Sequence, residues 1–141
     1  MLVTGLSFGS WPHPSRILGD AFIRWLFPDS VVGVDRDQAF CLRISDVLDL
    51  YEDMTDLSDE DVVRICSILM VEVVFLGHQS HTYVSDVVLR VVHDMDIWNE
   101  YPWGSHIWTI TYKHMDGAWT KRTKISNRIT IYGFLYVFQV T

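Results

Sequence analysis

The sequence predicts a mainly α-helical fold, organised as a single domain over residues 1–141. Apolar residues recur at three- and four-residue spacing through most of the chain, which is the pattern of a helix with one face toward a core. The chain is 49% hydrophobic and 13% aromatic, which is too apolar for a disordered protein. At 141 residues it is long enough to bury a core of its own.

The first part of the chain is expected to hold two helices. Residues 16–27 have apolar side chains at helical spacing, with Ser15 as the N-cap and Pro28 ending the helix. A polar connection over residues 28–39 then leads to a short helix over residues 43–52. Both helices are amphipathic, so each should place one face on the core.

A central helix over about residues 59–76 is the best-defined element of the sequence. Ser58 is a good N-cap, three acidic residues follow it, and Gly77 suits the position after the last turn. Apolar residues occupy almost the whole circumference, so we expect this helix to be buried on several sides. Arg64 and Glu72 should mark its remaining stripe, either wet or paired.

The second half of the chain begins with a turn over residues 78–83 and a helix over residues 84–94. Residues 98–104 combine three aromatic rings with a proline and a glycine, which predicts a tight, aromatic-filled corner between two helices. A further helix should run over residues 102–115, because proline suits a first helical turn. Residues 116–127 read as a polar loop.

The last segment, residues 129–140, is compatible with two structures. Its β-branched and aromatic residues favour a strand, whereas Ile131, Phe134, Leu135 and Phe138 share one helical face, and we assign a helix. Both ends of the chain are apolar, so we expect a fragment that is incomplete at both ends and self-associates through these unpaired segments. The aromatic residues expected to build the core and its corners are Trp25, Trp98, Trp103, Trp108 and Phe134.

Charge and composition exclude several classes of protein. The net charge of −7 argues against a protein that coats nucleic acid through its overall charge. The richest apolar run, residues 62–76, is too short and too interrupted by polar residues to cross a membrane, and the chain opens without a basic leader. Cys41 and Cys66 are too few for a disulfide framework, so we expect an intracellular protein, with the nucleus as one compartment.

No catalytic set of residues is evident, and we expect the chain not to be an enzyme. A cysteine protease needs a reactive thiolate beside a histidine base. Cys66 lies in the most apolar helix and Cys41 lies between Phe40 and Leu42, so both are expected to be buried structural thiols.

Neither a metal nor a cofactor is expected. His78 and His81, with Cys66 and His93, suggest zinc ligands, but no paired Cys-x-x-Cys completes a tetrahedral site, and solvated turn histidines explain them better. A group of acids lacks the alternation and central glycine of a calcium loop and instead complements a helix N-terminus. These acids are Asp53, Asp56, Asp59, Glu60 and Asp61.

One basic cluster stands out against the acidic background, and Trp119 beside it offers a stacking surface. It is the only candidate contact to nucleic acid, although a solvated loop explains it more simply. Its residues are Lys121, Arg122, Lys124 and Arg128.

Several segments together resemble a known family. They include residues 2–6, residues 75–77 and residues 92–99, and the most specific are two motifs with their mutual spacing. The motif residues are Tyr101, Pro102, Trp103, Gly104, Gly133 and Phe134. Taken together, the chain resembles the plant domain of unknown function DUF1985, which is found in many transposon-derived plant proteins. It departs from the pattern at Trp98, where phenylalanine is usual, and at Leu135, where proline is common.

The resemblance implies a role without supplying catalytic residues. Members of the family often lie beside a cysteine protease similar to those that cleave small ubiquitin-like modifiers. We therefore expect a non-catalytic protein-interaction or targeting module with an as yet unknown protein partner, and no membrane partner. The alternative is a nucleic-acid-associated factor that uses the basic residues 121–128.

Overall fold

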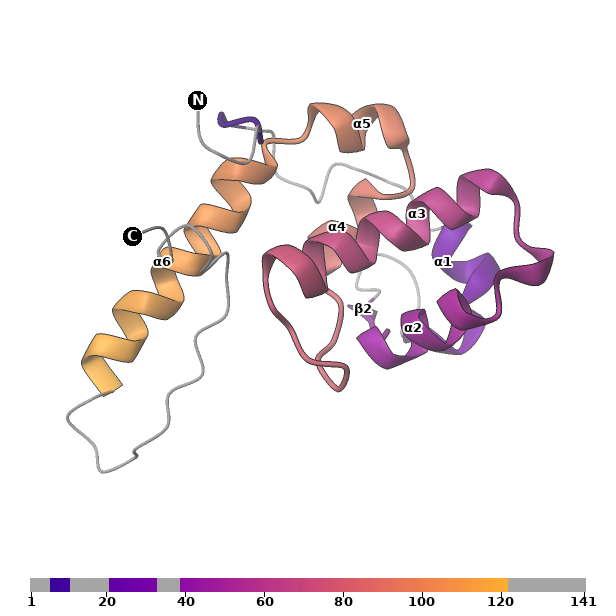
Figure 1. Cartoon of the computed structure of the whole chain (residues 1–141), viewed down its shortest axis with the longest axis horizontal. Helices are drawn as coiled ribbons and strands as arrows, with labels where there is room; N and C mark the ends of the chain where they lie inside the picture. The colour runs from indigo at the N-terminus through magenta and orange to yellow at the C-terminus, as the bar shows by residue number, and fades with distance from the viewer. Residues whose placement is uncertain (1–5, 11–20, 33–38, 122–141) are drawn as a thin grey trace.

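Helices make up most of the structure, which confirms the predicted mainly α class. The computed structural model describes residues 6–10, 21–32 and 39–121, and Figure 1 shows their arrangement as one small helical domain. The described elements are α1 (Ala21–Leu26), the 3-10 turn η2 (Pro28–Ser30), β1 (Val31–Val32), β2 (Ala39–Phe40), α2 (Ile44–Glu52), the 3-10 turn η4 (Met54–Asp56), α3 (Asp59–Leu69), the π-helical turn η5 (Met70–Phe75), α4 (Asp86–Val91), α5 (Met95–Glu100) and α6 (Trp103–Lys121).

The connection predicted over residues 28–39 contains structure that the sequence did not indicate. The 3-10 turn η2 follows Phe27, and two-residue strands β1 and β2 then pair antiparallel, with Val31 opposite Phe40. The predicted helix before it is described only over α1, because residues 16–20 lie outside the described part of the chain.

The helix α2 follows its prediction closely. Arg43 occupies the N-cap position, and its backbone N–H donates to the Asp46 side chain at 3.0 Å. This bond satisfies one of the amide groups that the first helical turn leaves without a partner. The helix packs against α3, and buries Ile44 and Val47.

The central helix begins and ends where the sequence predicts, but its winding changes. The Ser58 Oγ accepts a hydrogen bond from the Asp61 backbone N–H at 3.2 Å, and Gly77 has φ +67°, the left-handed conformation that glycine adopts without strain. From Met70 the regular α3 continues as the π turn η5, in which the Leu76 N–H reaches back five residues to Val71.

The hydrophobic core lies behind α3 and draws on every helix except the short α5. Figure 1 shows α3 running along the outside of the body, with α4 behind it and α2 beside it. The buried apolar residues are Phe22, Ile23, Leu42, Ile44, Val47, Ile65, Ile68, Val71, Leu76, Val84, Val88, Leu89, Val91, Val92, Tyr101, Trp103 and Ile107. The central helix thus contributes to the core from one side.

The helix predicted over residues 84–94 is the shorter α4, and a separate helix that the sequence did not predict, α5, follows it. The helix α4 ends at Val91, and α5 starts after Asp94, whose side chain accepts from the backbone N–H groups of Asp96 and Ile97. The N-cap bonds start a new helix in a new direction, so the predicted corner begins at Tyr101 instead of Trp98.

The helix α6 is longer than predicted. It runs to Lys121, so the loop expected over residues 116–127 is helical as far as residue 121. Gly117 weakens a helix by only about 1 kcal/mol and no proline interrupts the segment, so the helix continues. Residues 122–141 lie outside the described residues, and with them the helix assigned to residues 129–140 and the motif residues Gly133 and Phe134. No described helix has the length and apolarity to cross a membrane.

Candidate functional site

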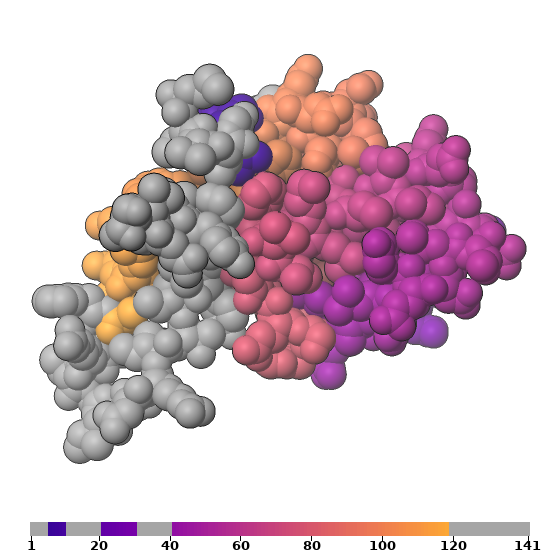
Figure 2. All heavy atoms as spheres, in the orientation of Figure 1, coloured from indigo at the N-terminus to yellow at the C-terminus, as the bar shows by residue number. Residues whose placement is uncertain are grey.

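The outer face of the central helix carries an exposed row of apolar side chains. We call it the apolar ridge, and its members are Val63, Cys66, Met70, Val73 and Val74. Met70 and Val74 are 53% and 57% exposed, although both belong to the helix that supplies the middle of the core. Figure 2 shows the atoms of α3 and η5 at the surface of the body. The expectation that this helix is buried on several sides is therefore wrong for this face.

The helical repeat explains how one helix comes to have two apolar faces. Val63, Cys66 and Met70 follow each other at three- and four-residue spacing, which places them on one side of α3, and the exposed Val73 and Val74 lie in the π turn that continues it. Ile65, Ile68 and Glu72 have the same spacing on the opposite side, and all three are fully buried. Neighbouring helices cover only this second side, so the ridge is left facing solvent.

Exposed carboxylates precede the N-terminal end of the ridge in the sequence, in the turn before α3 and in its first turn. We call this group the acidic collar, and its members are Asp53, Asp56, Asp59 and Glu60. Arg64, in the second turn of α3, bonds Asp61 at 3.0 Å and reaches Glu60 at 3.4 Å. Of the four collar residues, Arg64 thus forms an ion pair only with Glu60.

Glu72 is the polar residue of the buried face. Its Oε2 lies 2.6 Å from His78 Nδ1, and its Oε1 accepts from the Ser85 backbone N–H at 2.9 Å. The His78 backbone N–H also donates to the Glu72 carbonyl oxygen at 2.9 Å. Arg64 and Glu72 are therefore both paired, but the prediction that they share one stripe is wrong, because Glu72 is fully buried and Arg64 is partly exposed. The spacing from Ile65 through Ile68 is the sequence signal that would have placed Glu72 inside.

Two buried polar atoms lie near this carboxylate without a hydrogen-bond partner among the described residues, Ser85 Oγ and His106 Nε2. Burial lowers the pKa of His106, and the negative charge of Glu72 partly opposes that shift. A Ser–His–acid triad requires the serine hydroxyl to bond the histidine. Ser85 Oγ makes no such bond in the described part of the chain, so the cluster has the geometry of a structural link. We call Glu72 with its two partners, His78 and Ser85, the staple.

The cysteines and histidines lie differently from their prediction. Cys41 and Cys66 are both exposed free thiols, so the expectation of buried thiols is wrong, because Cys66 falls on the outer face of α3. His78 bonds Glu72 and is not a solvated turn residue. Among the residues that the structure describes, no three potential metal ligands come together.

The motif at Tyr101, Pro102, Trp103 and Gly104 is buried and forms the corner between α5 and α6. The Trp103 Nε1–H donates to the Trp98 carbonyl oxygen at 2.9 Å, and the two rings are centred 4.3 Å apart. The corner predicted from the aromatic residues is thus confirmed from Tyr101 onward.

The same corner holds the described N-terminal segment, residues 6–10. Gly104 N–H donates to the Ser7 carbonyl oxygen at 2.9 Å, and the Ser7 hydroxyl donates to the Tyr101 carbonyl oxygen at 3.0 Å. A Cβ on Gly104 would overlap the Phe8 ring and lie 2.7 Å from the Ser7 carbonyl oxygen, so this approach requires glycine. The motif therefore has an architectural role that links two distant parts of the chain.

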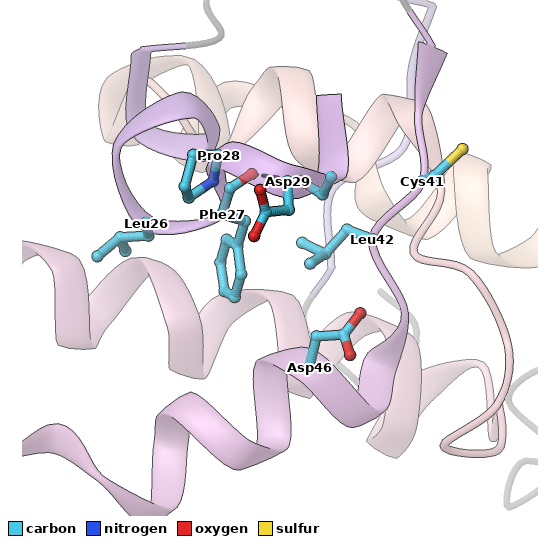
Figure 3. Close-up of a pocket in the computed structure, with 8 residues that line it drawn as sticks. Leu26, Phe27, Pro28, Asp29, Cys41, Leu42 and Asp46 are labelled. Carbon is cyan, nitrogen blue, oxygen red and sulfur yellow. Dashed lines mark hydrogen bonds between the residues drawn. The ribbon is translucent and has the colours of Figure 1, made fainter. Parts of the chain in front are cut away.

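A cavity of about 350 Å³ lies between η2, β2 and α2 (Figure 3). Asp29 and Asp46 direct their carboxylates into it, whereas the Cys41 sulfur points away. The Asp46 side chain already accepts a hydrogen bond from the Arg43 backbone N–H at the start of α2. This bond accounts for the position of Asp46, and no ligand is needed to explain it. The lining residues are Leu26, Phe27, Pro28, Asp29, Ser30, Cys41, Leu42 and Asp46.

The remaining predicted residues are the core tryptophans and the basic cluster. Trp25 and Trp108 are 77% and 48% exposed, so their assignment to the core is wrong, while Trp98 packs against the core. Lys121 ends α6 and does not lie in a loop. The other basic residues, Arg122, Lys124 and Arg128, and the core aromatic Phe134 lie outside the described residues.

No family model, curated protein or solved structure matches this chain. The resemblance to DUF1985 consequently stays a prediction from the residues quoted for it.

Proposed function

We propose that this chain is a non-catalytic protein-interaction domain whose partner docks on the apolar ridge. The observation that supports the proposal is the exposure of Val63, Met70 and Val74 on the best-defined helix of the domain. Single exposed apolar residues are ordinary, but a contiguous apolar surface is typical of interaction sites. Methionine adapts its shape to a partner and is enriched at interfaces.

The dimensions of the ridge favour a compact binding element. Eleven residue steps separate Val63 from Val74, which corresponds to about 17 Å of helix. Burial of a fully exposed aliphatic side chain is worth about 1.5–3 kcal/mol, and these side chains are half exposed, so association costs of about 4–15 kcal/mol would consume most of the gain. We therefore expect a complex that needs contacts beyond the ridge.

The identity of the domain is part of the same proposal. We infer membership of the plant DUF1985 family from the motif at residues 101–104 and its companion segments. The partner is then the protease of ubiquitin-like modifiers encoded alongside such domains in transposon-derived proteins. An intracellular location, the nucleus included, follows from that partner.

The first experiment is to read the full-length transcript and co-express this chain with the protease domain that it encodes. Binding is measured by titration of the two purified proteins. We expect Met70→Glu to weaken the complex at least tenfold, because a charge replaces an apolar contact in the middle of the ridge.

The matched control is Trp25→Glu, which introduces the same charge at an exposed apolar residue of α1. Thermal melts establish that both variants fold. Equal binding by wild type and Met70→Glu would show that the ridge is not the docking surface. DNA retention that is lost at high salt and with Lys121→Glu/Arg122→Glu, but unchanged by Met70→Glu, would favour the nucleic-acid alternative instead.

A further inference from the structure

Charge is distributed unevenly along the apolar ridge. The acidic collar places four exposed carboxylates at its N-terminal end. Arg64 is the only lysine or arginine between residues 44 and 89, and it bonds Asp61 and Glu60. The N-terminus of α3 offers only about half a positive charge, so the collar remains strongly negative.

The opposite end of the ridge lacks this charge. Residues 77–83 follow η5 and contain no carboxylate. Glu72, the last acid before them, is buried and bonds His78 and Ser85, so its charge faces the interior. The ridge is therefore acidic at one end, whereas the segment after its other end contains no carboxylate.

The hydrogen bonds that a partner's backbone needs favour one secondary structure for the segment that docks. An extended segment laid on an apolar helix would leave those of its N–H and C=O groups that face the ridge without partners, since the ridge offers no sheet edge. A helix satisfies these groups internally and packs its side chains between ridge residues at the same spacing. A helix of about three turns matches the 17 Å length of the ridge.

We propose that the segment which docks on the ridge is an amphipathic helix with a basic end, its apolar stripe on Val63, Met70 and Val74 and its lysines or arginines over the acidic collar. This inference rests on the proposed function and specifies the partner's chemistry. Charge complementarity of this kind accelerates association and selects the orientation of binding. It is also screened by salt, which gives the proposal a distinct signature.

The test uses three synthetic helical peptides of about 14 residues with one leucine stripe, which differ only in the last turn: lysines, glutamines or glutamates. The readout is protection of the two exposed thiols of the full chain from a small thiol reagent. Cys66 lies within the ridge, and Cys41 lies on β2's C-terminal side as an internal control. We expect the peptides to slow labelling of Cys66 and to leave Cys41 unchanged.

The expected order of affinity is lysine, glutamine, glutamate. At low salt we expect about a tenfold difference between the lysine and glutamine peptides, which shrinks as salt screens the collar. Asp59→Asn/Glu60→Gln should reduce binding of the lysine peptide to that of the glutamine peptide. The control Asp96→Asn/Glu100→Gln makes the same charge change on α5, away from the ridge, and should have little effect.

Each other outcome contradicts the proposal in a different way. Equal binding of all three peptides would support docking on the ridge but contradict the proposal that the partner helix has a basic end. Protection of Cys66 by the protease domain but by none of the peptides would uphold the proposed function and overturn the helical partner. Concentration-dependent protection of Cys66 without any peptide would identify a second copy of the chain as the occupant and overturn the inference.

Discussion

Glu72 and His78 form a hydrogen bond of 2.6 Å between Oε2 and Nδ1, which joins the π turn η5 to the loop that follows it. The second carboxylate oxygen accepts from the Ser85 N–H, at the start of α4. A wholly buried carboxylate thus finds partners for both oxygens. Because Val73 and Val74 directly follow Glu72 in η5, this staple also fixes the C-terminal end of the apolar ridge.

Removal of this carboxylate should destabilise the fold. Glu72→Ala leaves the Ser85 N–H buried without an acceptor and opens a cavity, which together should lower the free energy of unfolding by about 2–4 kcal/mol. Glu72→Gln keeps an acceptor for Ser85 and should cost less. Urea denaturation of the three proteins gives the comparison. An alanine variant as stable as wild type would show that the staple does not stabilise the domain.

The stability of the domain should fall on acidification through His106. Burial lowers the pKa of His106 below its ordinary value of 6.5, with Glu72 opposing the shift. Between these two pKa values the unfolded chain binds the proton and the folded chain does not, so stability decreases as pH falls below 6.5 and levels off below the folded pKa. Urea midpoints over this range should be less pH-dependent in His106→Gln. An unchanged pH dependence would contradict this role.

Trp103 should be the most important aromatic residue for stability. It is 6% exposed, whereas Trp108 in the same helix is 48% exposed. Trp103→Ala removes a buried ring and its bond to Trp98, so we expect a loss of about 3–5 kcal/mol. Trp108→Ala is the control and should change stability by less than about 1 kcal/mol. Similar melting midpoints for the two variants would mean that the corner is not tightly packed.

The two glycines of α6 should respond oppositely to alanine. Gly117→Ala has open space and should stabilise the helix by up to about 1 kcal/mol. Gly104→Ala places a methyl group against Phe8 and the Ser7 carbonyl oxygen, so it should displace residues 6–10 and destabilise the domain despite the better helix propensity. Hydrogen exchange of the Gly9 amide, which donates to Ser105 Oγ, reports the displacement. Retained protection of the Gly9 amide in Gly104→Ala would show that residues 6–10 are not displaced.

Both thiols should react with a small thiol reagent in the native protein, because Cys41 and Cys66 are exposed. We expect no accompanying hydrolysis of ubiquitin-like modifier substrates, because an exposed thiol does not by itself supply the histidine base that a cysteine protease needs. The measurement is labelling by mass spectrometry in parallel with a hydrolysis assay. Hydrolysis that disappears in Cys66→Ala would show that the chain is an enzyme.

The sequence by itself determined the helical class and several helix boundaries. Ser58 caps α3 and Gly77 ends the central helical segment with a positive φ, as their residue types predict. These features depend on hydrogen bonds and backbone preferences within a few residues, so the local sequence contains the necessary information. The aromatic corner at residues 101–104 was predictable for the same reason.

Only the tertiary structure decided which surfaces were buried. The central helix is apolar on both faces, and its pattern cannot state that neighbours cover Ile65 and Ile68 but not Met70. Trp25 and Trp108 are of a residue type that is common in cores, yet they lie at the surface because no neighbouring element that the structure describes covers them. Ser7 meets Tyr101 across 94 positions of sequence, a contact that no local signal contains. Burial depends on how distant elements pack together, and this packing determines where the chain can meet a partner.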